Sequence, residues 1–487
     1  MHPATVAILS ALAWSLAACA DPAAPTTQSP NASLGVSAAA PGMGRYLALL
    51  ANTSGGALAE EVATLGGRID WIAAGMATLS LLDESGAERI ARRSDVRLLV
   101  PDVALSLDLP PSVFDVVPVD APQPQAPATP GSSALYARQW NMRAIGADKA
   151  WAAGAFGSAT VTTFILDSGI DYEHVDLLGL VDNGRSADLT GTFPVVTTIA
   201  GRPTAVMFTE ADTVARYFPT RKPYTDLFYH GTHVAATVSS NAIVAAGVTS
   251  GTRLAAVKVC TYLNVCPFSS VLRGVIHAAD HGADVINLSL GGTFHKPGNG
   301  RLVHFVNRAF TYARARGVTV VVAAGNDGTD LDHDVAAYSA YCDAPGVICT
   351  AATGPTNQAS ADGPFTNVDA SASYSNFGRA AIDLAAPGGN INTPAAPNSF
   401  VYAACSQTSL VVPICRTGVF AIGSLGTSMA APHVSGAASL LVPRIGRNPA
   451  ALDAHLQRTL DDLGQPGTDP RYGKGRLNVG RAVAGLP

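Results

Sequence analysis

Three short segments of this sequence carry residue types that together can hydrolyse an acyl bond. They are Asp167-Ser168-Gly169, His230-Gly231-Thr232-His233 and Gly426-Thr427-Ser428-Met429-Ala430, in that order along the chain. A serine hydroxyl becomes a nucleophile when an imidazole accepts its proton and a carboxylate keeps that imidazole in the required tautomer. Because the segments supply one candidate for each role, they indicate nucleophilic catalysis by Ser428.

Both the serine and the histidine segments extend into longer patterns. The first continues as Ala431-Pro432-His433-Val434, and the second runs from His230 to Ala235. Together they resemble the signatures of subtilisin-type serine peptidases, the subtilases, over roughly residues 136–487. The resemblance implies an endopeptidase that acts on proteins or peptides through an acyl-enzyme.

This resemblance also assigns the catalytic roles. It makes Ser428 the nucleophile, His230 the general base and Asp167 the carboxylate that orients the imidazole. His233 is then expected to pack structurally, and Asp171 to be a local turn residue.

Further site residues follow from the same resemblance. Asn326 ends the family-like segment Ala-Ala-Gly-Asn and is expected to donate its side-chain amide to the oxyanion, together with the Ser428 backbone N–H. The family's substrate pocket implies two walls of small residues, with room for a large apolar side chain. The expected wall residues are Ser289, Leu290, Gly291, Ala323, Ala324 and Gly325.

The elements that must position these residues alternate between strands and helices. A buried strand, 161–166, precedes Asp167, and a helix with Pro432 in its first turn, 429–441, follows Ser428. This order predicts an α/β fold with a mostly parallel central sheet and helices on both faces, as in subtilisin. The other expected strands are 252–259, 284–290 and 318–323, and the other expected helices start at 231 or span 269–281 and 303–316.

Residues 44–108 read as a separate small unit with the order β-α-β-β-α-β. This order resembles the ferredoxin-like propeptide of subtilases, which inhibits the enzyme; an unrelated accessory domain is the alternative. A proline-rich linker, 109–134, is expected to stay extended and to contain the processing region before the peptidase domain, 135–487. An insertion at 183–226 flanks the cleft or decorates the surface.

The first residues predict export. Residues 1–19 read as a signal peptide that ends in the lipobox-like Leu16-Ala17-Ala18-Cys19, followed by a linker at 20–43. Lipidation of Cys19 would anchor a cell-envelope lipoprotein, whereas ordinary cleavage after Ala18 or Ala20 would release a secreted enzyme.

Six of the seven cysteines remain once Cys19 is set aside, and they fall into three close pairs. In an exported protein an even number indicates disulfides, although six cysteines allow about 15 connectivities. Sequential pairing is predicted, and a zinc site is the alternative, with spacings that lack a Cys-x-x-Cys element. The pairs are Cys260–Cys266, Cys342–Cys349 and Cys405–Cys415.

The composition gives no support for a nucleic-acid-binding or nucleotide-binding function. The formal net charge is −5, and no basic stripe or phosphate loop indicates a nucleic acid or nucleotide partner. No cofactor is required for the chemistry, and a monomer is expected.

Asp383 with the carbonyls of Pro345 and Val347 resembles a calcium ligand set of proteinase K-like subtilases, and a structural Asp is the alternative. A catalytically inactive peptide-binding surface protein on the same scaffold is the competing function.

Overall fold

The computed structural model describes most of the chain after residue 43. The described residues are 44–51, 55–107, 109, 114–120, 129–199, 202–333, 336–392 and 399–486. The predicted signal peptide, Cys19 and the linker at 20–43 lie outside them. Within the described part, no helix has both the length and the apolar character needed to cross a membrane.

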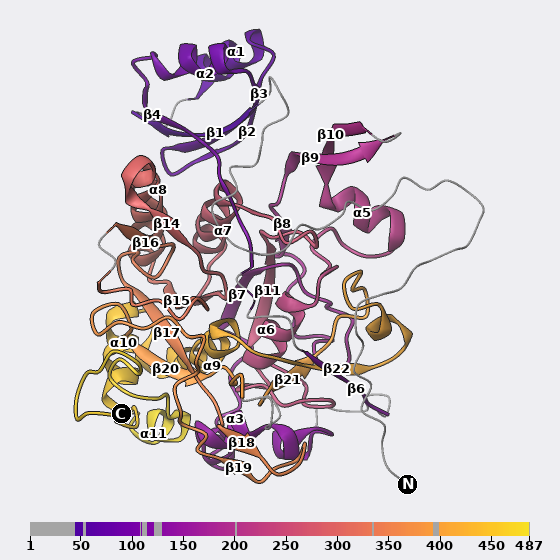
Figure 1. Ribbon diagram of the computed structural model, residues 1–487, viewed down its shortest axis with the longest axis vertical. Coiled ribbons are helices and arrows are strands. Elements are labelled where there is room, and N and C mark those ends of the chain that lie inside the picture. The colour runs from indigo at the N-terminus through magenta and orange to yellow at the C-terminus, as the bar shows by residue number, and fades with distance from the viewer. Residues whose placement is uncertain are drawn as a thin grey trace.

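The N-terminal unit is a four-stranded antiparallel sheet with two helices. Its sheet order is β2-β3-β1-β4, and the core lies between this sheet and the helices. Asp83 caps the second helix by accepting a hydrogen bond from the Gly86 N–H at 2.6 Å. Figure 1 shows this unit at one end of the molecule with its helices facing away from the rest. The elements are β1 (Gly44–Leu50), α1 (Gly56–Thr64), β2 (Arg68–Ala73), β3 (Met76–Leu82), α2 (Glu84–Ala91) and β4 (Val96–Pro101).

The larger domain is built on a seven-stranded sheet of order β20-β17-β15-β13-β7-β11-β8, in which every pairing is parallel. The predicted mostly parallel sheet is therefore confirmed. Its strands are rich in Val, Ile and Ala because both faces are covered. The strands are β7 (Thr162–Asp167), β8 (Ala187–Asp188), β11 (Arg253–Lys258), β13 (Val285–Leu288), β15 (Thr319–Ala323), β17 (Val347–Thr353) and β20 (Leu384–Pro387).

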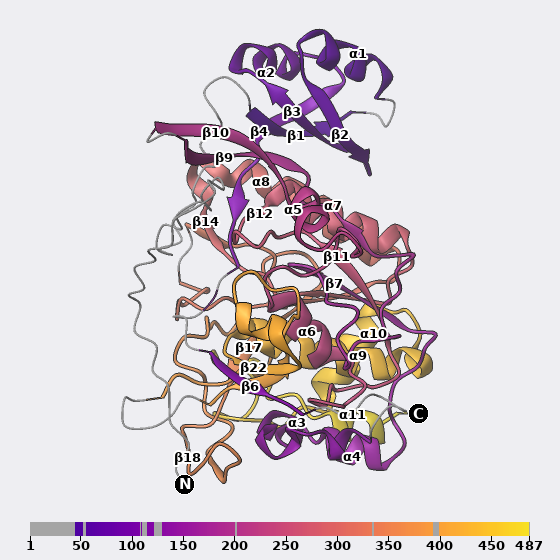
Figure 2. The ribbon, with the colours of Figure 1, turned by 90° about the vertical axis from the view of Figure 1, so that its right-hand side faces the viewer.

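Helices cover both faces of this sheet (Figure 2). α7 and α8 pack on one face, whereas α6 and α9 pack together on the other. Neighbouring residues of β7 show this division: Phe164 and Leu166 belong to one apolar cluster and Ile165 to another. The helices are α3 (Trp140–Ala144), α4 (Ala147–Ala152), α5 (Glu210–Tyr217), α6 (His230–Val238), α7 (Phe268–Asp280), α8 (Lys296–Ala315), α9 (Thr427–Ile445), α10 (Pro449–Arg458) and α11 (Val479–Ala484).

Shorter elements connect and decorate the domain. The insertion at 183–226 contributes β8, a β9–β10 hairpin and α5. Three disulfides lie among the described residues, and they join the cysteine pairs predicted from the sequence. The remaining strands are β5 (Ala104–Leu105), β6 (Asp115–Pro118), β9 (Thr192–Ile199), β10 (Arg202–Thr209), β12 (Cys266–Pro267), β14 (Thr293–His295), β16 (Ala337–Ser339), β18 (Asn357–Gln358), β19 (Phe365–Thr366), β21 (Val401–Ala404) and β22 (Phe420–Ser424), with short 3-10 turns at Pro130–Ser132, Tyr136–Arg138 and Pro413–Thr417.

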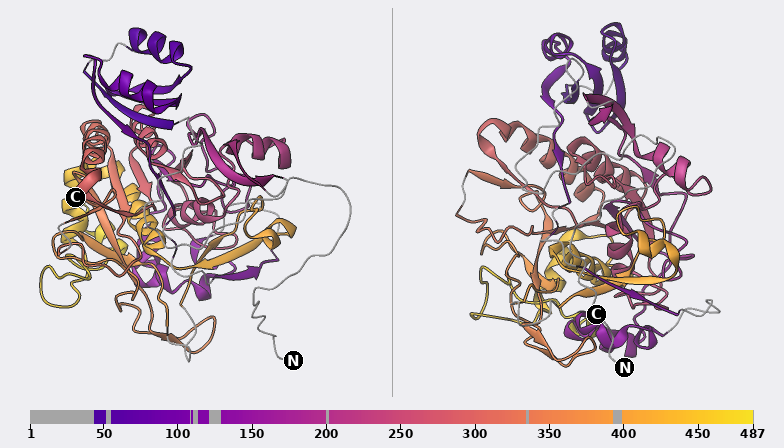
Figure 3. Two further views of the ribbon diagram at one scale, coloured as in Figure 1. Left: turned by 45° about the horizontal axis from the view of Figure 1, so that its top comes forward. Right: turned by 45° about the vertical axis from the view of Figure 1, so that its right-hand side comes forward.

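The segment between the two units forms two short strands that pair with strands of the larger domain. β5 pairs with β12 of the larger domain, and β6, within the predicted linker, pairs with β22. The two views of Figure 3 show the N-terminal unit seated on the larger domain, near α8 and the β9–β10 hairpin. Two strands that precede the larger domain in the sequence therefore each pair with one of its strands.

Candidate active site

Asp167 and His230 meet at the carboxyl end of the sheet. Asp167 is the last residue of β7, His230 is the first residue of α6, and both side chains are buried. His230 Nδ1 lies 2.8 Å from Asp167 Oδ1 and 3.0 Å from Oδ2. The Ser168 N–H donates to Asp167 Oδ1 at 2.7 Å, and the Val259 N–H donates to the Asp167 carbonyl at 2.8 Å. The carboxylate is thus held in place beside the imidazole, as the predicted role of Asp167 requires.

Ser428 lies near the start of α9, which begins two residues earlier than the sequence analysis expected. Pro432 therefore lies beyond the first turn, where it has no N–H to donate to the Ser428 carbonyl. The Ser289 hydroxyl supplies the missing donor, at 2.7 Å from that carbonyl. The proline is tolerated because Ser289 replaces the lost helical hydrogen bond, and this contact also fixes Ser428 against Ser289.

The Ser428 hydroxyl points away from the imidazole. It donates to the Ser289 carbonyl at 3.0 Å, and among the described residues His230 Nε2 has no hydrogen-bond partner. A hydrogen bond from Ser428 to His230 requires the hydroxyl to leave Ser289. Catalytic hydrogen bonds are often long or unformed before substrate binds, so this arrangement fits a resting site.

Asn326 lies close to the nucleophile. Its side-chain oxygen accepts hydrogen bonds from the Thr427 N–H at 2.8 Å and from the Thr427 hydroxyl at 3.0 Å. These two bonds define which end of the carboxamide is oxygen and direct the amide nitrogen to the other side. The predicted oxyanion donor is therefore oriented by the residue that precedes Ser428.

The two predicted pocket walls adjoin each other. A Cβ added to Gly291 would lie 3.4 Å from Gly325 Cα and 3.7 Å from the Ala323 carbonyl. Leu290 and Ala324 are buried beside them. Gly291, in the loop after β13, thus lies within contact distance of Ala323, the last residue of β15, and of Gly325 in the loop that follows it.

The carboxylate of Asp226 was missed by the sequence analysis. It is fully buried and accepts four hydrogen bonds: from the Ser168 hydroxyl at 2.9 Å, the Phe228 N–H at 2.9 Å, and the Thr232 N–H and hydroxyl at 2.9 and 2.6 Å. Burial raises the pKa of Asp226 to about 6, and the Thr232 donors oppose this shift. Asp226 joins the residue after Asp167 to the first turn of α6, which carries His230. Its position four residues before His230 does not distinguish it from an exposed aspartate, so the sequence alone could not identify it.

His233 and Asp171, the two residues that the sequence analysis set apart from the triad, are both buried. His233 is buried with Nε2 3.0 Å from the Val401 carbonyl, and burial lowers its pKa to about 3, which fits packing. Asp171 is more than a turn residue, because it is buried and pairs with Arg221 at 2.9 Å.

The predicted calcium ligand Asp383 accepts a hydrogen bond from the Cys349 N–H at 2.8 Å, and burial raises its pKa to about 6. Pro345 and Val347 are partly exposed in and before β17. No three His, Cys, Asp or Glu side chains cluster as metal ligands in the described part of the chain. Calcium binding here stays a prediction.

A stretch of the chain itself lies in this site. Leu105 pairs with Cys266, and a Cβ on Gly292, next to the wall residue Gly291, would lie 3.5 Å from the Leu105 side chain. Leu107 is buried in the apolar cluster that includes Tyr229, the neighbour of His230. Residues 103–107 therefore run between β12 and the pocket wall, and Ser428 is only 3% exposed.

Sequence comparison relates this arrangement to known enzymes. A sequence model described as the subtilase family matches residues 159–475. The thermophilic serine proteinase of Bacillus sp. (strain AK1) is 30% identical over 358 residues, which cover 73% of this chain and 69% of that protein. Thermitase of Thermoactinomyces vulgaris is also 30% identical over 358 residues, which cover 73% of this chain and 99% of thermitase.

Structural comparison gives similar folds at lower identity. The epidermin leader peptide processing serine protease from Staphylococcus aureus has a TM-score of 0.65 and 19% identity, and the match covers 91% of this chain and 99% of that one. Fervidolysin from Fervidobacterium pennivorans, a keratinolytic enzyme, has a TM-score of 0.63 and 20% identity, covering 95% and 63%. At these identities the likeness concerns the fold alone.

Proposed function

This chain belongs to the subtilase family of serine endopeptidases, and on that basis we propose that Ser428, His230 and Asp167 form its catalytic triad. The observation that carries the assignment is the 2.8 Å contact between His230 Nδ1 and Asp167 Oδ1. A carboxylate beside Nδ1 favours the tautomer with its proton on Nδ1, and in that tautomer Nε2 is the basic nitrogen.

The proposed reaction proceeds in two steps. Ser428 Oγ attacks the carbonyl carbon of the scissile bond while His230 Nε2 accepts the hydroxyl proton. The Asn326 amide and the Ser428 N–H stabilise the oxyanion, and His230 then gives the proton to the leaving amine. Water, activated by the same imidazole, hydrolyses the acyl-enzyme and restores Ser428. Asp167 stabilises the imidazolium in both steps.

We further propose that the chain is made as a self-inhibited precursor. The pairing of β5 with β12 and the position of Leu105 beside Gly292 support this, because an extended substrate is expected to pair with the same edge. The unit at 44–108 would then be the inhibitory propeptide. Export and lipidation at Cys19 belong to this proposal and rest on the sequence alone.

The test compares the full-length protein with Ser428→Ala and with Ser439→Ala, a buried serine on the same helix. Intact mass and casein hydrolysis are followed over time. The wild type and Ser439→Ala are expected to shorten and to digest casein, whereas Ser428→Ala does neither. Equal activity of the Ser428→Ala protein would refute the triad, and inactivity of all three after limited trypsin treatment would favour a peptide-binding scaffold.

A further inference from the structure

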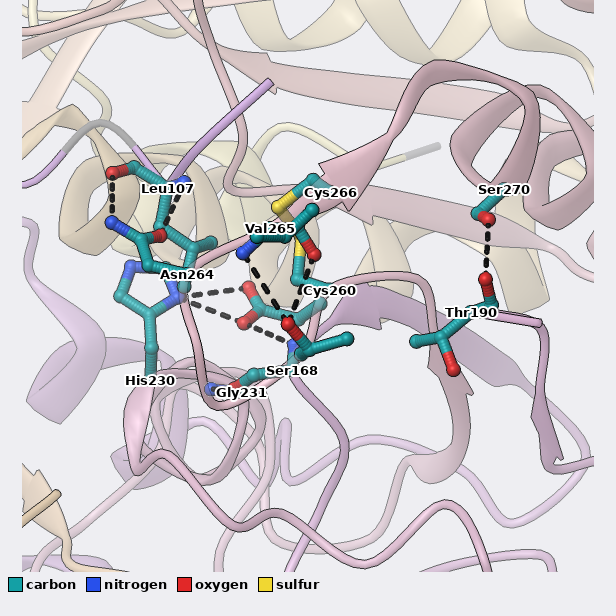
Figure 4. Close-up of a disulfide and its surroundings, with 12 residues drawn as sticks. Leu107, Ser168, Thr190, His230, Gly231, Cys260, Asn264, Val265, Cys266 and Ser270 are labelled. Carbon is teal, nitrogen blue, oxygen red and sulfur yellow. Dashed lines mark hydrogen bonds and ion pairs between the residues drawn. A yellow bond between two sulfur atoms is a disulfide. The ribbon is translucent and has the colours of Figure 1, made fainter. Parts of the chain in front are cut away.

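The disulfide Cys260–Cys266 closes a loop beside the proposed catalytic pair. The loop leaves β11 where the Val259 and Cys260 N–H groups donate to the Asp167 carbonyl, at 2.8 and 3.2 Å. It ends at β12, which pairs with β5. Figure 4 shows Cys260, Cys266, Asn264 and Leu107 in the same neighbourhood as His230. One disulfide therefore joins the end of β11, next to Asp167, to β12, the strand that pairs with residues 104–105. Residues 103–107 are called the pro-segment below.

Hydrogen bonds within the loop and one hydrogen bond to the insertion determine the loop's conformation. Inside it, the Thr261 N–H donates to the Val265 carbonyl at 2.9 Å, and the Asn264 N–H donates to the Thr261 carbonyl at 3.0 Å. Outside it, the Glu210 carboxylate of the insertion accepts from the Tyr262 N–H at 3.3 Å. The insertion at 183–226 thus holds the loop through a hydrogen bond to its main chain.

Asn264 occupies the tip of the loop in a left-handed conformation, with φ 60°. Asparagine tolerates this region better than other residues that carry a Cβ. The conformation brings its carboxamide to the pro-segment, where Oδ1 accepts from the Leu107 N–H at 2.7 Å and Nδ2 lies 3.4 Å from the Leu107 carbonyl. A side chain here pairs with both main-chain groups of one residue, as a neighbouring strand would.

We infer that Asn264 is a substrate-binding residue that pairs with the main chain of whichever residue occupies the place of Leu107. Before maturation that residue is Leu107 itself, and afterwards it belongs to the peptide substrate. This inference rests on the proposed function. The disulfide and the hydrogen bond to Glu210 hold the loop in one conformation, so the Asn264 carboxamide stays directed toward the position of Leu107. Because the contact is made to main-chain atoms only, it holds the peptide without selecting its side chains.

The experiment uses mature wild-type enzyme, Asn264→Gly and Asn264→Asp. Glycine keeps the left-handed backbone and removes the carboxamide, whereas aspartate keeps the acceptor oxygen. Active-site titration with a fluorophosphonate gives the concentration of folded, competent enzyme in each preparation. The value of kcat/KM for extended peptide anilides is expected to fall about tenfold in Asn264→Gly and no more than about threefold in Asn264→Asp.

A second arm locates the contact on the substrate. Peptides carrying a single N-methyl amide at successive positions are compared, because methylation removes the N–H that Asn264 Oδ1 accepts. At one position methylation should cost the wild type about tenfold more than it costs Asn264→Gly, which is the signature of a coupled pair. Equal costs in both enzymes at every position would overturn the inference, as would unchanged kcat/KM in Asn264→Gly.

The disulfide is tested with paired serine substitutions. Cys260→Ser with Cys266→Ser should raise KM for the extended peptides, whereas Cys405→Ser with Cys415→Ser, at another loop, should leave it unchanged. Similar KM values for both double variants would contradict the role given to the Cys260–Cys266 loop. Failure of the proposed function has a different outcome, since the wild type would then neither titrate with the fluorophosphonate nor cleave any peptide.

Discussion

Replacing Lys258 by methionine should destabilise the precursor strongly, because it breaks a buried ion pair. Lys258 Nζ lies 2.7 Å from Glu210 Oε1, and both side chains are fully buried. Lys258 Nζ also donates to the Thr225 carbonyl at 2.6 Å. The pair fastens the insertion to the end of β11, next to the loop that carries Asn264.

The size of the stability loss follows from the Glu210 carboxylate, which stays buried without a counter-charge. Methionine fills a similar volume, so the main loss is the counter-charge of Glu210, and removing one partner of a buried pair costs about 3–5 kcal/mol. Burial already raises the pKa of Glu210, with Lys258 opposing the shift. A carboxyl with a raised pKa in the folded state favours folding when it is protonated. The stability lost by Lys258→Met should therefore shrink as the pH falls and Glu210 becomes protonated.

Urea unfolding on a Ser428→Ala background, which prevents self-digestion, measures the change. Lys258→Met with Glu210→Leu should recover about half of the loss, because two apolar residues replace the pair, while the Thr225 hydrogen bond stays broken and the Tyr262 hydrogen bond to Glu210 is lost as well. Arg92→Ala, which removes an exposed ion pair with Glu88, serves as the control and should change little. A loss below about 1 kcal/mol in Lys258→Met, or a double variant no more stable than the single one, would refute the reasoning.

Further predictions concern the site and its surroundings. Asn326→Ala should lower kcat by about 10²- to 10³-fold, the loss known for the comparable donor in subtilisin, with KM nearly unchanged; a loss below tenfold would exclude Asn326 as an oxyanion donor. Burial raises the pKa of Asp383 to about 6, so without calcium the Tm of Asp383→Asn relative to Ser428→Ala alone should rise from pH 4 to pH 7, both measured on that background. A calcium-dependent rise in Tm that Asp383→Asn abolishes would support the predicted calcium site. Met429 adjoins Ser428 and is fully buried, so peroxide should reduce turnover slowly as the sulfoxide forms, checked by peptide mass; undiminished turnover of oxidised enzyme would contradict this.

The sequence predicted the parallel sheet and the disulfide pairs because their signals are local. An apolar β-rich strand runs into Asp167, and the paired cysteines are six to ten residues apart. The helix after Ser428 was placed two residues late, since Pro432 was read as a first-turn proline. The contact that permits the earlier start comes from Ser289, which lies 139 residues away in the sequence.

Buried polar partners were the features that sequence patterns could not reveal. Asp226 hydrogen-bonds to Ser168 across 58 residues, and Glu210, at the start of α5 in the insertion, pairs with Lys258 at the end of β11. Neither carboxylate has a periodic or spaced motif that distinguishes it from an exposed Asp or Glu. Burial of a charge becomes visible only when tertiary structure brings its donors together.

Cleavage of the precursor should not by itself release the proposed propeptide. The Asp102 carboxylate accepts from the Ser269 N–H at 2.9 Å and from its hydroxyl at 2.5 Å, at the start of α7, where a negative charge is favourable. Arg45 pairs with Asp102 at 3.1 Å, and the side chain of Arg308 on α8 donates to the Ala74 carbonyl. The N-terminal unit's residues in these contacts, and β5 in its pair with β12, all precede residue 109, so a cut in the predicted processing region leaves the contacts intact.

Activation should therefore depend on dissociation or degradation of the N-terminal unit, and activity should lag behind processing. Asp102→Ala would remove the acceptor at α7 and the ion pair with Arg45, which should shorten the lag without changing kcat of the mature enzyme. The lag is measured by following peptide hydrolysis and intact mass in the same sample. If hydrolysis rises in step with cleavage in the wild type, the contacts of Asp102 do not hold the cut unit in place. A persistent complex would also keep the mature enzyme attached to any anchor on the N-terminal unit, which reconciles a lipid at Cys19 with processing downstream of it.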